Sequence, residues 1–249
     1  MTKAISGIMH LHTKYSYDGT VSLREVAKTA KKRGFSFLLL TEHSNHFDAQ
    51  KMTRLIADCR AFSTEEFVII SGLEVDCDFG RHILAIGIKQ YIGTGDPARV
   101  VEAIRENGGL AVLAHPALYQ FRSFLPSAAK LNGVEVWNSR YDGKYAPNPK
   151  SFTMLKSLQN ENPRIFAYGG QDLHSAKEFD PLCLTLDASS VSERDVLQCL
   201  EAGRFKVVRK RTTIDASGEI SSAQRLLFDI VNSGYMLGRA LRSSLREAP

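Results

Sequence analysis

The sequence predicts an α/β protein that forms a closed or nearly closed barrel, followed by a C-terminal amphipathic helix. Two observations carry this prediction. Short apolar segments that suit buried strands alternate with helical segments, and the joints between them are short, which favours a parallel sheet. Polar residues follow the apolar segments, as catalytic groups do at the strand ends of α/β barrels. An open doubly wound sheet would gather its functional residues at one crevice instead, so we prefer the barrel.

The expected strands are short apolar runs that end in polar residues. The run at 67–72 leads through a turn at 78–80 into the run at 83–88, which suggests a hairpin-like extension. The full set of expected strands covers residues 4–9, 35–40, 67–72, 83–88, 110–114, 134–137, 164–168, 182–186 and 203–208.

The expected helices combine apolar residues at helical spacing with helix-starting signals. Ser22 followed by Glu25 fits a capping box, Asp96-Pro97 fits a helix start, and Ser192 fits a cap. The full set of expected helices covers residues 22–33, 49–62, 97–106, 123–130, 151–159, 192–201 and 223–246.

Two regions follow from these elements. We assign residues 1–209 to the barrel, and residues 210–249 to a polar linker and the C-terminal helix. We expect this helix to pack against the barrel or to join two copies of the chain in a homo-oligomer, and we prefer both to attachment at a membrane surface.

Composition excludes several classes of protein. The chain has 249 residues, of which 43% are hydrophobic, and it contains no apolar run long enough to span a membrane. Its N-terminus lacks a signal-peptide pattern. Its four cysteines are far apart and form no Cys-x-x-Cys pair, which indicates free thiols in a reducing cytoplasm. We therefore expect a cytoplasmic protein.

The charge is unevenly distributed along the chain. The net charge is +5, yet residues 1–202 hold 23 basic and 23 acidic residues, while residues 203–249 hold nine basic and four acidic ones. Residues 1–202 are thus formally neutral, which argues against a basic groove for nucleic acid, although a local patch would be compatible with this balance.

Histidines and carboxylates cluster where the expected strands end. His10 and His12 leave the first strand two residues apart and therefore on the same face. Most of the other histidines also follow strands or begin the hairpin arm. With three carboxylates they give nine candidate metal ligands: His10, His12, Asp18, His43, Glu74, His82, His115, Asp172 and His174. We set His46 aside as an exposed loop residue.

Nine ligands are too many for one ion, because zinc-like sites use about four. The sequence therefore predicts two or three divalent ions, which would be zinc, manganese or iron, since mixed imidazole and carboxylate ligands suit all three. Such centres generate a metal-bound hydroxide and hold phosphoryl oxygens. The chain has no Gly-x-Ser-x-Gly and no P-loop pattern, so hydrolysis without a nucleophilic side chain is the chemistry we expect.

The chain resembles the PHP family, the polymerase and histidinol phosphatase superfamily. Four motifs carry the resemblance: His10-Leu11-His12-Thr13 with Asp18-Gly19, Thr41-Glu42-His43, Leu113-Ala114-His115-Pro116 and Asp172-Leu173-His174-Ser175. Asp18 stands where histidinol phosphatases usually carry a histidine, which is more similar to the branch of small stand-alone phosphoesterases. The resemblance covers about residues 4–208 and implies a distorted (β/α)7 barrel.

The resemblance also implies a division of the ligands. One ion would be held by His10, His12, Glu74 and Asp172, a second by Glu74, His82 and His115, and a third by Asp18, His43 and His174. Two residues depart from the family pattern without removing a ligand. Glu42 replaces the usual aspartate, and we expect it to support a ligand rather than to be one. Gln171 replaces a usual serine.

The predicted function is a metal-dependent phosphoesterase acting on a small phosphorylated metabolite or a nucleotide. Glu74, Asp172 and His174 are the catalytic candidates together with Arg140, whose guanidinium suits a phosphate. Arg140, Asn138, Lys14 and Arg81 are the candidate substrate contacts, and the loop at 141–148 is a candidate cover. Two alternatives are a hydrolase of a non-phosphate ester or carbamate, and a regulatory metal-binding domain without turnover. The complete ligand set favours the enzyme.

Overall fold

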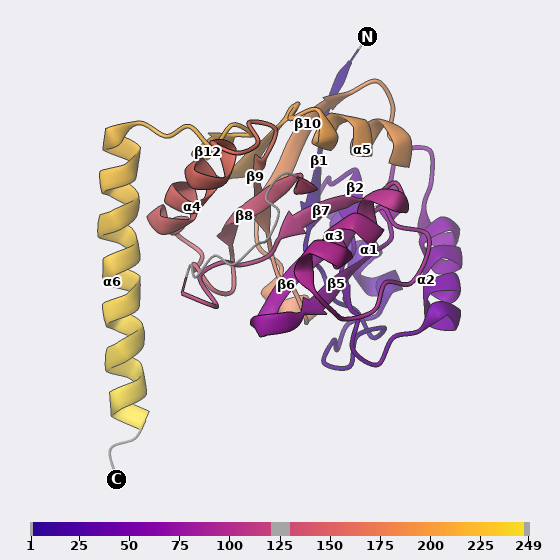
Figure 1. Cartoon of the computed structure of the whole chain (residues 1–249), viewed down its shortest axis with the longest axis horizontal. Helices are drawn as coiled ribbons and strands as arrows, with labels where there is room; N and C mark the ends of the chain where they lie inside the picture. Colours follow the sequence, from indigo (N-terminus) through magenta and orange to yellow (C-terminus); the bar gives the residue numbers. More distant parts are fainter. Residues whose placement is uncertain (1, 121–129, 247–249) are drawn as a thin grey trace.

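The strands pair into two six-stranded sheets in the computed structural model, which describes residues 2–120 and 130–246 (Figure 1). The first sheet has the order β12 (Thr212–Asp215), β11 (Phe205–Arg209), β10 (Cys183–Ala188), β1 (Lys3–Met9), β2 (Phe37–Leu39) and β4 (Val68–Ile70). The second has the order β3 (Glu42–His43), β5 (Gly72–Cys77), β6 (Arg81–Ile86), β7 (Leu110–Leu113), β8 (Gly133–Asn138) and β9 (Phe166–Gly170).

Most helices begin within one residue of the predicted start, for local reasons, whereas α4 begins two residues earlier, at Pro149 after the cap Asn148. Ser22 forms a capping box with Glu25 at the start of α1, Asp96 accepts backbone hydrogen bonds ahead of Pro97 in α3, and Ser192 caps α5. The α-helices are α1 (Leu23–Lys32), α2 (Ala49–Phe62), α3 (Pro97–Glu106), α4 (Pro149–Gln159), α5 (Glu193–Glu201) and α6 (Ser222–Arg246), with short 3-10 turns η1 (Asp78–Gly80) and η3 (Ala176–Glu178). The helix expected at 123–130 lies largely outside the described residues.

The two sheets are joined at the ends of β1 and β9. The backbone after β9 runs beside the backbone after β1: the Gln171 N–H donates to Met9 O at 2.9 Å, and the His12 N–H donates to Leu173 O at 2.8 Å. The chain also passes from β2 directly into β3 and from β4 directly into β5. In the first sheet β2 pairs with β4, and in the second sheet β3 pairs with β5, both in parallel. Polar segments that follow strands of different sheets therefore meet in one region.

The core between the sheets and the helices is largely apolar. Strands β2 and β7 are buried along their whole length, and so is most of β1 towards its C-terminal end. Burial of such runs is the main favourable contribution to folding, and it fixes the strand ends from which the polar residues project. Among the described residues, no helix combines the length and hydrophobicity that crossing a bilayer requires.

The α/β class is confirmed, but a closed seven-stranded ring is not. The strand pairs form two separate sheets, and several pairs are antiparallel: β1 with β10, β10 with β11, β11 with β12, β5 with β6 and β6 with β7. The expected parallel pairing thus holds for only part of the two sheets, because alternating elements specify burial without specifying the direction of each neighbouring strand. The antiparallel pair of β5 and β6 is the hairpin that the sequence suggested.

Part of the expected linker is also a strand. Thr212–Asp215 forms β12, which pairs antiparallel with β11 through a tight turn in which Lys210 has a φ of 52°. The division expected after residue 209 thus falls at the turn of this hairpin. The expected C-terminal helix is present as α6, which stands beside α4 at one side of the molecule (Figure 1).

Candidate metal centre

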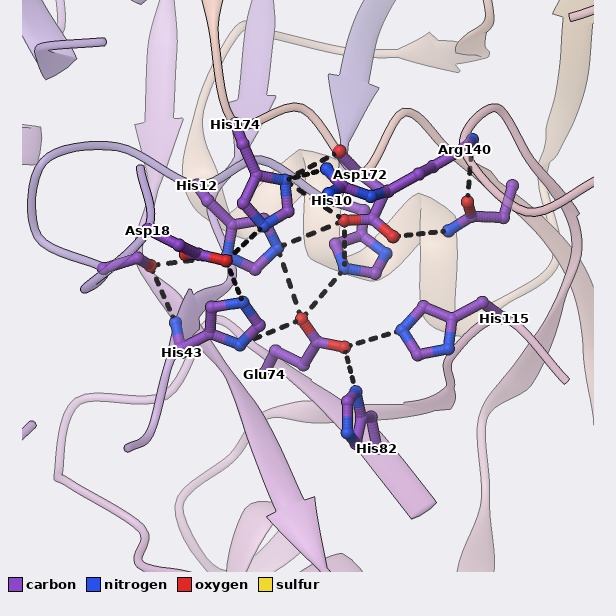
Figure 2. A network of polar contacts seen from close by, with 12 residues as sticks. His10, His12, Asp18, His43, Glu74, His82, His115, Arg140, Asp172 and His174 are labelled. Carbon is purple, nitrogen blue, oxygen red and sulfur yellow. Dashed lines mark hydrogen bonds and ion pairs between the residues drawn. The ribbon is translucent and has the colours of Figure 1, made fainter. Parts of the chain in front are cut away.

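All nine candidate ligands lie in one cluster (Figure 2). They are contributed by segments that end or follow strands of both sheets. His10 and His12 follow β1, His43 ends β3, Glu74 lies in β5, His82 in β6, His115 follows β7, Asp172 and His174 follow β9, and Asp18 lies in the loop before α1. Backbone strain marks this region, because His10, His115 and Asp172 all have positive φ.

Glu74 lies at the centre of the cluster, with both carboxylate oxygens facing imidazoles (Figure 2). Only 1% of its side chain is exposed. Oε1 lies 2.7 Å from His82 Nδ1 and 2.8 Å from His115 Nε2. Oε2 lies 3.2 Å from the Nε2 atoms of His10 and His12, and 3.4 Å from His43 Nδ1. One carboxylate thus faces five imidazole rings, an arrangement suited to bridging cations.

The other two carboxylates lie at the edges of the same cluster. Asp172 Oδ1 lies 3.4 Å from His174 Nδ1, and 3.7 Å and 3.8 Å from the Nε2 atoms of His12 and His10. Asp18 Oδ2 lies 3.1 Å from His174 Nε2 and 3.5 Å from His43 Nε2. Asp18 is the most exposed of the three, so this edge of the cluster is open to solvent.

The donor atoms form four overlapping groups, each with its atoms within 4.8 Å of one another: His12, His43 and His174; His10, His115 and Asp172; His10, His12 and Glu74; and Glu74, His82 and His115. The last group coincides with the second expected ion site. The first group contains His43 and His174, which are expected to hold the third ion with Asp18, and it adds His12 to them. Overlapping groups of this kind suit neighbouring ions that share ligands.

Unpartnered nitrogens show that this cluster fits metal ions. His12 Nε2 and His43 Nδ1 are buried and point towards Glu74 Oε2, yet neither makes a hydrogen bond to any described residue. His115 Nδ1 is also buried without such a partner. A buried polar atom without a partner costs free energy. Neutral imidazole is a common metal ligand, and a divalent ion would satisfy the atoms that face Glu74.

The electrostatics of the cluster also indicate a need for positive charge. Burial opposes ionisation of Glu74, but the charge of His10 and the hydrogen bonds from His10 and His115 outweigh it and hold the Glu74 pKa well below its usual range. Burial lowers the pKa of His43 to about 4. His82 shows the opposite result: burial is outweighed by its bonds to Asp76 and Glu74, and its pKa rises to about 10. Cations at the centre would replace such protons.

Glu135 contacts two candidate ligands, and the sequence did not point to it. It lies in β8 and is completely buried. Oε1 lies 2.9 Å from His10 Nδ1, and Oε2 accepts hydrogen bonds from the His115 N–H at 2.8 Å and from Asn138 Nδ2 at 3.1 Å. Glu135 therefore orients two candidate ligands from behind. The available signal was a glutamate inside an otherwise uncharged buried strand, since unpaired buried charges are rare.

Glu42 supports the ligand loop, as the sequence suggested. Its carboxylate accepts hydrogen bonds from the Thr13 N–H at 2.9 Å, the Thr13 hydroxyl at 2.6 Å and the Ser16 hydroxyl at 2.6 Å. Ser16 Oγ in turn accepts from the His43 N–H at 2.9 Å and lies 3.3 Å from His12 Nδ1. Glu42 thus fixes the backbone that presents His12 and His43.

Asn138 and Arg140 lie beside the cluster. Asn138 Nδ2 lies 3.4 Å from Asp172 Oδ2, while its Oδ1 accepts the backbone N–H groups of Arg140 and Tyr141. The Arg140 guanidinium donates to His174 Nδ1 at 3.0 Å, and 45% of its side chain is exposed (Figure 2). Arg140 and Asp172 both line a cavity of about 460 Å³, so a guanidinium faces solvent next to a candidate ligand.

The remaining expected contacts lie elsewhere or face other groups. Lys14 is exposed and lines a separate surface cavity with Asp58. The Arg81 guanidinium is mostly buried, donates to Phe79 O at 2.6 Å and lies over the ring of Tyr119. His46 is exposed on its loop, in agreement with its exclusion from the ligand set.

The fold and the cluster define a class of α/β proteins with a metal-binding centre built from histidines and carboxylates. A sequence model of one such family, the PHP domain, matches residues 9–145. This match covers more than half of the chain, and the chain therefore belongs to the PHP domain family.

Two proteins are similar in sequence to parts of this chain. An uncharacterised protein of Methanocaldococcus jannaschii is 28% identical over 163 residues, which is 60% of this chain and 91% of that one. The DNA polymerase/3'-5' exonuclease PolX of Bacillus subtilis is 31% identical over 134 residues, which is 45% of this chain but only 23% of PolX.

The fold also matches a solved structure. A two-domain protein from Bacteroides vulgatus, described as containing a predicted PHP-like metal-dependent phosphoesterase, superposes with a TM-score of 0.63 at 16% identity. The match covers 86% of this chain and 67% of that one. At this identity the likeness concerns the fold alone.

Proposed function

We propose that the protein hydrolyses phosphoesters at a centre of two or three divalent metal ions. The observation that carries the proposal is the position of the buried Glu74 carboxylate between five imidazoles. In the arrangement we propose, one ion is held by His10, His12, Glu74 and Asp172, a second by Glu74, His82 and His115, and a third by Asp18, His43 and His174. Zinc, manganese and iron all suit these ligands.

Ions bound here would activate a water molecule and offset the negative charge of a phosphoryl group. The residues of the chain have the remaining roles. Glu74 would hold neighbouring ions close together, and Asp172 and His174 would complete their ligand sets. Arg140 binds phosphate oxygens through its exposed guanidinium, because a planar fork of donors matches them. Asn138 fixes both Asp172 and the turn that presents Arg140.

We propose a small phosphorylated metabolite or a nucleotide as the substrate. Residues 1–202 carry no excess positive charge, which disfavours a long nucleic acid. The similarity to part of PolX nevertheless makes the end of a DNA strand a substrate to include in a screen.

We also propose that residues 1–209 form the catalytic unit as a distorted (β/α)7 barrel. The backbone bonds between the ends of β1 and β9 support this proposal, as does the direct passage of β2 and β4 into strands of the second sheet. Residues 210–249 then add β12 and α6. The exposed side chains of Leu226, Leu227 and Ile230 on α6 are compatible with a homo-oligomer.

The function is tested by stripping the protein of metal with a chelator and reconstituting it separately with zinc, manganese or iron. We expect at least two equivalents of metal per chain and metal-dependent release of 4-nitrophenol from 4-nitrophenyl phosphate. Glu74→Gln keeps the size but removes the bridging charge, so it should lower both metal content and rate, the rate on the order of 100-fold. His46→Ala, which changes an exposed residue outside the cluster, is the control and should retain both.

The alternatives give different outcomes in the same assay. Turnover of 4-nitrophenyl acetate or an aryl carbamate, but of no phosphate, would identify another hydrolase. Full metal occupancy without turnover of any substrate would identify a regulatory domain. A folded Glu74→Gln protein with full metal content and full rate would refute the bridging role.

A further inference from the structure

The C-terminal helix reaches the cavity beside the metal centre. Tyr235 of α6 lines the same 460 Å³ cavity as Asp172 and Arg140. Asp172 is a candidate metal ligand, so the cavity opens directly onto the site of the proposed chemistry. A group attached to a phosphate at the metal centre would extend into this space.

The position of α6 is fixed by contacts along its first half. Phe228 is buried and packs against Phe152 of α4, with the ring centroids 6.2 Å apart. Arg225 donates to Thr153 Oγ1 of the same helix at 2.8 Å. One turn beyond Phe228 along α6, Asn232 Nδ2 donates to Pro147 O at 3.2 Å. The helix is therefore attached both to α4 and to the loop that precedes it.

Tyr235 packs on that loop at Gly143. A Cβ atom at Gly143 would lie only 3.0 Å from the Tyr235 ring, and the glycine has a φ of +89°, which disfavours other residues. From the inside, Trp137 Nε1 donates to Gly143 O at 3.0 Å. The loop is thus held between Trp137 and Tyr235, and the same loop carries Lys144 and Tyr145 into the cavity.

The lining of the cavity combines charged and aromatic groups. Arg140 and Lys144 supply positive charge, and the Glu178 carboxylate lies 3.9 Å from the Arg140 guanidinium. Tyr145 and Tyr235 supply rings, and 71% of Tyr145 is exposed. Exposed tyrosine rings beside a cavity offer flat apolar surfaces for stacking. The matching ligand is a phosphoester whose leaving group carries a planar ring, with the phosphate held at the ions and Arg140.

We propose that α6 is part of the substrate site and that Tyr235, together with Tyr145, selects phosphoesters with a planar ring in the leaving group. This proposal rests on the phosphoesterase function proposed above and names its substrate class. Tyr235 acts on the bound leaving group and takes no part in the cleavage of the phosphoester bond.

The test compares benzyl phosphate with cyclohexylmethyl phosphate, which differ in the flatness of the ring but have similar alkoxide leaving groups. For Tyr235→Ala we expect KM for benzyl phosphate to rise about three- to tenfold, the range of a lost aromatic contact. KM for cyclohexylmethyl phosphate should change little, and kcat should be retained for both. Tyr235→Phe keeps the ring and should behave as wild type. Ile230→Ala removes an exposed side chain of the same helix and is the matched control.

A second measurement does not depend on turnover. In calorimetry of metal-loaded protein, we expect Tyr235→Ala to weaken the binding of benzylphosphonate by the same factor of about three to ten. The binding of methylphosphonate should not change. If Tyr235→Ala weakened the binding of both phosphonates equally and raised KM equally for both substrates, Tyr235 would have a purely structural role and the proposal would be overturned. The proposal would also be overturned if Tyr235→Ala changed none of these affinities. If no phosphoester is hydrolysed, the proposed function fails, whereas the two phosphonates still decide whether Tyr235 binds a ring.

Discussion

Asp142 is a buried acid outside the metal cluster whose ionisation should affect stability. Its Oδ2 accepts the Asn138 N–H at 2.8 Å, but its Oδ1 has no hydrogen-bond partner among the described residues. Burial raises the pKa of Asp142 from 3.8 to about 8. At neutral pH the carboxyl is therefore mainly protonated in the folded protein and ionised in the unfolded chain.

The sign of the resulting pH dependence follows from these two values. The folded state binds one more proton than the unfolded state between about pH 4 and about pH 8, so stability falls as pH rises through this window. Asp142→Asn keeps an acceptor oxygen but cannot ionise. The variant should therefore gain stability relative to wild type by about 1.4 kcal/mol per pH unit between about pH 5 and about pH 8.

Urea unfolding at several pH values measures this difference. Asp229→Asn, which changes an exposed carboxylate on α6, is the matched control and should follow wild type throughout. A constant difference between Asp142→Asn and wild type across the window would show that Asp142 is ionised in the folded protein.

At the scale of single residues, the clustering of the candidate ligands and the supporting role of Glu42 were predictable, whereas the role of Glu135 was not. Histidines directly after apolar runs stand out because imidazole is uncommon and strand ends converge. Glu135 was missed because it lies within a strand that the sequence marks only as buried. The contact of Glu135 with His10 joins residues 125 positions apart, and no local pattern encodes such a pair. Lys14 and Arg81 were named for sequence proximity alone, which does not fix the direction of a side chain.

At the scale of elements, the end of β9 shows why a glycine is required beside the cluster. A Cβ atom at Gly170 would lie 1.9 Å from Glu135 Oε1 and 2.7 Å from His10 Cβ. Because Gly170 has no side chain, Glu135 can approach His10 at this end of β9.

Gly170→Ala should displace Glu135 and disturb the ligand that it orients. We expect a loss of about 1–3 kcal/mol in the free energy of unfolding from overpacking, and metal affinity about 10- to 100-fold lower because the support of His10 is lost. Metal titration and urea unfolding measure the two effects.

Gly95→Ala is the control for this substitution, because a Cβ atom there would meet no neighbour within 4 Å. It should preserve both metal affinity and stability. Unchanged metal affinity in a folded Gly170→Ala protein would mean that Glu135 does not set the position of His10.

The same scale shows which elements a sequence pattern can reveal. The apolar strands and capped helices were predicted because their signals are local. Strand β12 was missed because Thr212, Thr213 and Asp215 give it no apolar run, and only Ile214 is buried. Its pairing with β11 depends on a tight hairpin turn at Lys210, which has no glycine to mark it.

At the scale of the whole molecule, the cluster joins the two sheets. His10 and His12 follow β1 of the first sheet, whereas Glu74 and His82 belong to strands of the second. The sequence predicted the meeting of these residues but not the division into two sheets, because buried strands look alike whether their neighbours are parallel or antiparallel. Ions shared by these ligands would connect both sheets.

Metal binding should consequently raise the melting temperature of the entire protein in a single transition. An ion at 100 times its dissociation constant adds about 2.7 kcal/mol, and 1 kcal/mol shifts Tm by about 2–4 °C in a protein of this size. We therefore expect a rise of about 5–10 °C for each strongly bound ion when zinc is returned to metal-free protein in a scanning calorimeter. The rise should shrink near pH 5, because imidazoles must be deprotonated to bind metal.

Two variants show whether the rise comes from the cluster. His46→Ala should show the wild-type increase, whereas Glu74→Gln should lose most of it, since Glu74 contacts donors from both sheets. An undiminished increase in Glu74→Gln would place the stabilising ions elsewhere. Two separate transitions, of which only one responds to zinc, would mean that the ions stabilise one sheet without connecting it to the other.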